Sequence, residues 1–184
     1  MKLVREILIY VAVGAAIYAA MQFTMQNYTV VYTSMLPGIE QGDWLRVEKV
    51  SYWIGKPDRG DVIVFWPPKE ESQTPYIKRI IGLPGDSVEV SNGKVIVNGI
   101  ALTEPYISQP PRYTLGRTVV PPDNYFVLGD NRNNSVDSHG GWTVTKDSIV
   151  GKGWFIYWPP SRWGLVPNAD LTSQVAPKTA AAVK

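Results

Sequence analysis

The longest run of apolar positions in the chain lies near its amino terminus. Residues 7–25 contain no charged side chain, and a helix needs ~20 such residues to cross a bilayer. Lys2 and Arg5 precede the run, and basic residues are retained on the cytoplasmic side of a membrane helix. The pattern predicts a cytoplasmic amino terminus over residues 1–6 and a single transmembrane anchor over residues 7–25, with the rest of the chain on the far side.

A cleaved secretory signal is the main alternative interpretation of this run, because it also combines a basic start with an apolar centre. The run is longer than the core of a usual signal, however. Its carboxyl end, Ala19-Ala20-Met21-Gln22, matches a small-x-small cleavage site poorly. A buried core helix would not be so uniformly uncharged, so a retained anchor is the preferred interpretation.

Beyond Tyr28 the hydrophobic pattern changes to one that is typical of β-strands. Alternating or short apolar segments of strand length occupy five ranges: residues 44–50, 61–66, 87–91, 124–128 and 149–158. Asn92-Gly93 separates two alternating segments, which predicts a hairpin with a two-residue turn.

The chain after the anchor shows no helical periodicity comparable with that of residues 7–25. Residues 26–167 are therefore predicted to form a mainly β domain. Within this domain, the proline-rich segment 102–120 is expected to be a loop. Residues 168–184, which end in a run of alanines, are expected to be a disordered tail.

The composition restricts the chemistry that the chain can perform. It has no cysteine, which excludes disulfides and thiolate metal sites. Its single histidine, His139, cannot supply a cluster of histidine metal ligands. The formal net charge of +2 gives no general basic surface, so nucleic acid is not an expected partner. We expect neither a metal nor a cofactor.

Two residues in separate segments could carry chemistry, although each taken alone favours an ordinary structural explanation. Ser34 stands before an apolar pair and Pro37, and by itself it is best explained as a turn hydroxyl. Lys78 lies among isoleucines at positions 77, 80 and 81. Such a lysine either reaches solvent along its stem or occupies an apolar pocket, where desolvation lowers its pKa and lets it act as a general base.

A dense polar segment, residues 129–138, follows a predicted apolar strand. It could be a solvated loop or a calcium loop. The calcium interpretation fails because Arg132 takes the third ligand position and no glutamate closes the loop.

Taken together, the chain resembles the bacterial type I signal peptidases, which use a serine-lysine dyad. Four segments carry the resemblance in the same order, from the anchor to about Trp158: residues 34–37, 59–65, 76–86 and 129–138. The resemblance implies a single transmembrane helix followed by a coiled antiparallel β-sheet catalytic domain. It also implies a plasma-membrane protein whose catalytic domain lies on the outer face.

The resemblance assigns a role to each matching residue. Ser34 falls on the nucleophile, and Lys78 falls on the general base. Ser135 falls on a serine that orients the lysine by a hydrogen bond, and Asp137 falls on an aspartate that holds the surrounding loop.

The implied substrates are the signal peptides of exported preproteins, with small side chains at the first and third positions before the cut. Met35 and Ile77 match positions that line the pockets for these side chains, although ordinary core packing would also explain them. The lipid bilayer is an expected partner, and the secretion translocon is a further one. Trp154, Trp158 and Trp163 could contact the bilayer surface or pack in the core.

The chain departs from the family pattern at two places. Tyr32 stands where the family often has a serine that donates a hydrogen bond to the oxyanion, and His139 stands where an arginine usually pairs with the aspartate. These departures leave the second oxyanion donor and the geometry of the loop open.

Three other functions compete with the signal peptidase interpretation. Self-cleaving repressors use the same dyad but carry a DNA-binding domain where this chain has an apolar run. A Ser-His-Asp hydrolase would have to use His139. A catalytically inactive, membrane-tethered β module would bind peptides by strand addition without cutting them.

Overall fold

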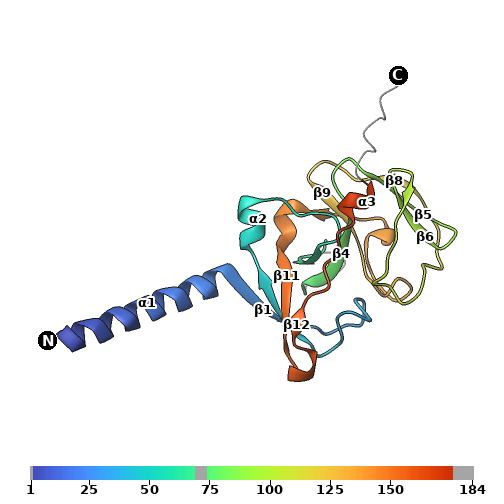
Figure 1. Cartoon of the computed structure of the whole chain (residues 1–184). Coiled ribbons are helices and arrows are strands. Elements are labelled where there is room, and N and C mark those ends of the chain that lie inside the picture. The colour runs from blue at the N-terminus through green and yellow to red at the C-terminus, as the bar shows by residue number, and fades with distance from the viewer. Residues whose placement is uncertain (1, 69–73, 176–184) are drawn as a thin grey trace, which may run out of the picture.

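The computed structural model describes residues 2–68 and 74–175. Helix α1 (Lys2–Thr24) projects away from a β-rich domain (Figure 1), and none of its residues is buried. In the described part of the chain, α1 is the helix that is long and apolar enough to cross a membrane, judged by length and composition. It begins before the uncharged run and leads directly into strand β1 (Met25–Thr29).

Two antiparallel sheets make up the domain. The larger sheet runs in the order β1, β2 (Trp44–Glu48), β11 (Ile149–Trp158), β3 (Val62–Phe65), β4 (Tyr76–Gly82), β9 (Asn124–Leu128) and β10 (Val144–Thr145), with β12 (Gly164–Leu165) paired to β11. The smaller sheet runs in the order β7 (Ile100–Ala101), β6 (Lys94–Val97), β5 (Ser87–Ser91) and β8 (Leu115–Val119). The prediction of a mainly β, antiparallel domain is confirmed.

Short helices complete the described chain. Two are α-helical, α2 (Val50–Ile54) and α3 (Thr172–Val175), and three are 3-10 turns: η1 (Ser138–Gly140), η2 (Lys146–Ser148) and η3 (Pro160–Arg162).

Local sequence signals predicted six of the twelve described strands, namely β2, β3, β5, β6, β9 and β11. The strand predicted over residues 149–158 coincides with β11. Asn92 and Gly93 have φ angles of 51° and 71°, and both positive values suit the turn type that joins twisted strands most tightly. This turn connects β5 to β6 in the register Ser91 to Lys94.

The structure differs from the expected loop over residues 102–120. Its carboxyl-terminal part, Leu115–Val119, forms β8 and pairs with β5. Most side chains of β8 are exposed or half-buried. Because its side chains are not buried, this edge strand lacks the apolar alternation by which strands are recognised in a sequence. Its hydrogen bonds come from β5, a neighbour that is distant in the chain.

The structure also differs at the start of the tail that was expected to be disordered. Asn168 accepts a hydrogen bond from the Val62 backbone N–H at 2.7 Å and donates one to the Gly153 carbonyl at 3.1 Å. Leu171 and Val175 are buried in the core beside the smaller sheet. The packed chain therefore continues to Val175, and residues 176–184 lie outside the described residues.

Candidate active site

Ser34 lies in the segment that connects β1 to β2 of the larger sheet. The apolar side of this segment is anchored in the core, because Met35 and Ile39 are fully buried among residues of β2 and β3. Ser34 itself is 7% exposed and lines a cleft. The burial of its neighbour thus holds the Ser34 hydroxyl at the cleft wall.

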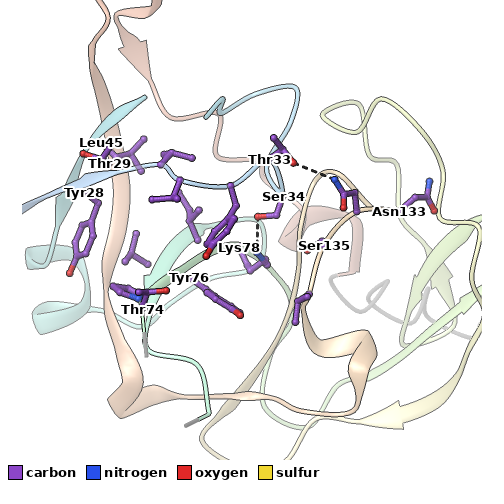
Figure 2. Close-up of a pocket in the computed structure, with 18 residues that line it drawn as sticks. Tyr28, Thr29, Thr33, Ser34, Leu45, Thr74, Tyr76, Lys78, Asn133 and Ser135 are labelled. Carbon is purple, nitrogen blue, oxygen red and sulfur yellow. Dashed lines mark hydrogen bonds between the residues drawn. The ribbon is translucent and has the colours of Figure 1, made fainter. Parts of the chain in front are cut away.

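Lys78 comes to the same place from β4, a strand with a neighbour on each side. Lys78 pairs with Ile63 of β3, and the next residue, Arg79, pairs with Leu128 of β9. The Lys78 side chain is almost completely buried, and its Nζ shares a hydrogen bond of 2.7 Å with Ser34 Oγ. Figure 2 shows the two side chains meeting at the cleft. The structure therefore brings together the two residues that the sequence analysis assigned to the dyad.

Burial changes the acid-base behaviour of Lys78. Desolvation lowers the pKa of this amine to about 8, although the charges of Asp137 and Asp130 act in the opposite direction. A group with this pKa is neutral in about a tenth of the molecules at pH 7. A neutral amine in contact with a serine hydroxyl can accept its proton.

This pKa sets an expected pH dependence. Because the base must be unprotonated, kcat/KM for peptide cleavage should rise with pH and reach half of its maximum near pH 8. The measurement is a pH profile of kcat/KM on a peptide that has no titratable group near the cut. A profile that falls with rising pH would contradict a lysine base, because it would require a protonated group instead.

The segment after β9 clamps the turn that carries Ser34. The Asn131 backbone N–H donates to the Ser34 carbonyl at 2.9 Å, and the Asn131 side-chain amide donates to the Thr33 carbonyl at 3.1 Å. Asn134 adds a hydrogen bond from its amide nitrogen to Thr33 Oγ1 at 3.3 Å. Sequence reasoning assigned no role to Asn131, and the polar run after an apolar strand was the only signal for it.

Gly129 opens this segment at a point of close contact. A Cβ at this position would overlap Ser135 Oγ and would lie 2.6 Å from the Ser34 carbonyl oxygen. A side chain of any size would therefore push apart the nucleophile turn and the loop.

Asp137 holds the same loop from within. Its Oδ2 accepts a hydrogen bond from the Gly129 N–H at 2.9 Å, and its Oδ1 lies 2.6 Å from His139 Nδ1. The His139 ring stacks on Tyr113 with a centroid distance of 4.4 Å. The hydrogen bond to Asp137 raises the pKa of His139 above its ordinary value. His139 is thus a partner of Asp137, and it is not among the residues that line the cleft with Ser34.

Ser135 lines the cleft with Lys78, but its hydroxyl does not make the hydrogen bond to Lys78 that was expected. Ser135 Oγ is buried and has no hydrogen-bond partner among the described residues. No hydrogen bond joins it to Lys78 in that part of the chain, so the orienting role stays a prediction. A buried hydroxyl without a partner carries a free-energy cost of about 1–3 kcal/mol, which a contact with substrate or with the amine would relieve.

The cleft has a volume of about 800 Å³ and separates three pieces of chain. One wall is residues 28–34, the second is residues 74–78, and the third is residues 133–136; Leu45 and Val64 complete the lining. Ile77 lines the cleft, and its contact with substrate stays a prediction. Met35 does not, because its side chain points into the core. In the described residues no group of three or more acidic or histidine side chains is placed to hold a metal ion.

Two buried ion pairs involve β4, the strand that carries Lys78, and the loop that follows β9. Arg79 contacts Asp130 through two hydrogen bonds of 2.8 and 2.6 Å, and neither side chain is exposed by more than 1%. Arg132 makes two contacts of 2.7 Å to Glu104. The Tyr106 ring lies 4.0 Å from the Arg79 guanidinium and extends this cluster. Neither pair was foreseen, because their partners are far apart in the sequence.

Comparisons with known proteins identify the family of the chain. A family model described as signal peptidase, peptidase S26, matches residues 2–158. The chain is 48% identical over 137 residues to a signal peptidase I of Leptolyngbya laminosa, covering 71% of this chain and 68% of that protein. It is 46% identical over 150 residues to a probable signal peptidase I-2 of Synechocystis sp., covering 79% and 69%.

Solved structures are similar as well. The crystal structure of a signal peptidase I from Enterococcus faecalis V583 is 33% identical and has a TM-score of 0.46, covering 54% of this chain and 97% of that one.

Proposed function

The chain belongs to the peptidase S26 family of signal peptidases, and from this premise we propose that Ser34 and Lys78 carry out its reaction. The protein is a serine endopeptidase that removes signal peptides from preproteins. One observation supports the assignment of the dyad above all others: the almost fully buried Lys78 amine lies 2.7 Å from the Ser34 hydroxyl.

The reaction follows from the protonation states of this pair. The neutral Lys78 amine accepts the proton of Ser34 as Ser34 Oγ attacks the carbonyl carbon of the scissile bond. The resulting ammonium then donates its proton to the leaving amine. Departure of this amine leaves an acyl-enzyme, an ester of Ser34. A water deprotonated by Lys78 hydrolyses this ester and regenerates the pair.

The oxyanion of the tetrahedral intermediate needs hydrogen-bond donors. The Ser34 backbone N–H is the first donor in our proposal. Thr33 is our candidate for the second, because its Oγ1 accepts a hydrogen bond from the Asn134 amide, which leaves the hydroxyl hydrogen of Thr33 for another acceptor. Tyr32, at the position of the usual donor, lines the cleft and is 63% exposed.

We propose that a signal peptide binds in the cleft in an extended form. Main-chain hydrogen bonds to the cleft walls would hold the peptide, and apolar surface at Ile77, Leu45 and Val64 would accept its side chains. In this arrangement Ile77 contacts the substrate directly. Met35 supports the same surface from the core beneath it, since it shares a buried cluster with these residues.

The test of this function is cleavage of a preprotein by the full-length protein in phospholipid vesicles, with the cut mapped by mass spectrometry. We expect a single cut after a small residue. Replacing that residue of the preprotein with phenylalanine should abolish cleavage, because we propose that the subsite next to the cut accepts only a small side chain. The Ser34→Ala protein serves as the inactive control. Binding of the preprotein without any cut by the unaltered protein would favour the peptide-binding module.

The apolar helix and the relatives fit a membrane-anchored enzyme. We propose that residues 7–25 span the plasma membrane once, with residues 1–6 in the cytoplasm and the peptidase domain, residues 26–167, on the outer face. Trp154, Trp158 and Trp163 are 44%, 48% and 65% exposed, so they are not core residues, and we propose that they contact lipid. The secretion translocon is the proposed source of the substrates.

A further inference from the structure

The aromatic ring of Tyr76 lies against the amine of Lys78, and we infer that Tyr76 is a further positioning residue of the reaction. In this inference the electron-rich face of the ring stabilises the lysine ammonium that forms when Ser34 gives up its proton. Sequence reasoning assigned no role to Tyr76. The inference rests on the proposed dyad of Ser34 and Lys78, and it adds a residue that acts through Lys78.

The backbone of β4 brings the ring and the amine together. Tyr76 and Lys78 are two positions apart in this strand, so their side chains leave the same face of the sheet. The Lys78 Nζ lies over the Tyr76 ring, 5.1 Å from its centroid, and cation–π contacts extend to about 6 Å. Both residues line the cleft with Ser34 (Figure 2). The ring therefore covers one side of the amine that reacts with Ser34.

The neighbouring strand holds the ring in place. Tyr76 pairs with Phe65 of β3 in the register of the sheet. The two rings meet edge to face, with centroids 6.3 Å apart and an angle of 81° between their planes. Phe65 is fully buried, so this contact limits the orientations that are open to the Tyr76 ring.

The ammonium of Lys78 needs such a contact because it is buried without a charged partner. No carboxylate forms an ion pair with this amine in the described part of the chain. Asp130 and Asp137 act on it only through space, since Asp130 is bonded to Arg79 and Asp137 to His139. The face of an aromatic ring carries negative potential, and its attraction for a cation is larger where water is excluded.

The effect of the ring on the titration of Lys78 has a definite sign. The titratable groups around this amine come from three elements: Asp130 and Asp137 from the loop after β9, Tyr28 and Tyr32 from the opposite wall of the cleft, and Tyr76 from β4 itself. The facing strand β3 adds only apolar side chains. Desolvation lowers the pKa of Lys78, and the two carboxylates raise it. The ring acts in the same direction as the carboxylates, because it favours the charged amine. Its removal should therefore lower the pKa of Lys78, whereas a loss of packing that admitted water would raise it.

The first measurement compares Tyr76→Leu with the unaltered full-length protein in detergent, using a short soluble peptide as substrate. Leucine keeps the apolar packing and removes the ring. At high pH, where Lys78 is neutral, kcat should fall about 3- to 10-fold, the factor expected for a desolvated cation–π contact, and KM should stay nearly unchanged. The pH at which kcat/KM is half-maximal should fall by about 0.5–1 unit, because the same contact sets the pKa of the base.

A pair of ring variants keeps the test independent of any folding defect in Tyr76→Leu. Phenylalanine and 4-cyanophenylalanine at position 76 present the same ring, but the cyano group withdraws electrons from its face. Tyr76→Phe should keep kcat within about twofold of the unaltered protein, because its ring face is retained. The cyano variant should be slower than Tyr76→Phe and should have the lower half-maximal pH. Equal rates and equal pH profiles for the two ring variants would contradict the inference.

Tyr157 offers a matched control, because Arg46 lies over its ring at 5.6 Å and the residue does not line the cleft. Tyr157→Leu should change neither kcat nor the pH profile.

The remaining outcomes each have one meaning. A higher half-maximal pH in Tyr76→Leu would show that the ring only keeps water out, and a rise in KM alone would show that it only contacts substrate; either result overturns the inference. Lys78→Met separates this inference from the dyad. If Lys78→Met stays active, the dyad itself fails, whereas an inactive Lys78→Met beside an unchanged Tyr76→Leu overturns the role of the ring alone.

Discussion

Replacing Lys78 with methionine is expected to lower preprotein cleavage by about 10²- to 10⁴-fold, the contribution usual for a general base. Methionine has a similar length and fills the apolar site without an amine. Ser34 would then lose the group that shares its 2.7 Å hydrogen bond. Burial disfavours the charged form of Lys78, so its removal should not unfold the protein. Initial rates with a preprotein in vesicles give the effect on activity, and thermal denaturation checks the fold.

Two further variants make this result specific to Lys78. Lys94→Met changes an exposed lysine of β6 and should leave the rate unchanged. His139→Ala tests the alternative triad, since His139 bonds to Asp137 but does not line the cleft. It should retain substantial activity. If His139→Ala were inactive and Lys78→Met active, the dyad would have to be abandoned.

Replacing Asp130 with alanine is expected to give the largest loss of stability. The Arg79 guanidinium would remain buried at 0% exposure without the carboxylate that accepts two of its hydrogen bonds. Breaking one half of a buried pair typically costs about 3–5 kcal/mol. Urea denaturation of the detergent-solubilised protein, followed by tryptophan fluorescence, measures the change in the free energy of unfolding.

Activity should fall together with stability in this variant, because Arg79 follows Lys78 in β4 and Asp130 follows Gly129 in the loop that clamps Ser34. Asp130→Asn should be milder, since an amide oxygen still accepts one hydrogen bond from Arg79. Asp147→Ala removes an exposed carboxylate of η2 and is the matched control; its effect should stay within about 0.5 kcal/mol. An Asp130→Ala protein as stable as this control would show that the pair does not hold the site together.

Sequence patterns located six of the twelve described strands, but gave no strand at β1 or at β4, which carries Lys78, and read two packed segments as loop and disorder. The hairpin at Asn92-Gly93 and the strand β11 depend on neighbouring residues, so their signals are local. The strand β8 and the segment from Asn168 to Val175 depend on partners far along the chain, namely β5 and the core beside the smaller sheet. Their own composition, polar or proline-rich, indicated loop and disorder.

The same distinction holds within the active site. The resemblance to a family proposed Ser34 and Lys78, and the structure places them together. The resemblance did not predict the orientation of the side chains. Met35 follows Ser34 in sequence, yet it turns into the core while Ser34 faces the cleft. Ser135 lies beside Lys78 along the cleft, yet its hydroxyl has no partner among the described residues.

By itself the sequence determined the apolar anchor, the β character of the domain and the exclusion of thiol and multi-histidine chemistry, because each depends on composition or on a short-range pattern. Tertiary structure alone decided that Lys78 meets Ser34 across 44 positions of chain and that Arg79 meets Asp130 across 51. The pairing of β4 with both β3 and β9 produces these contacts. It also excludes water from Lys78, and this desolvation gives the amine its lowered pKa.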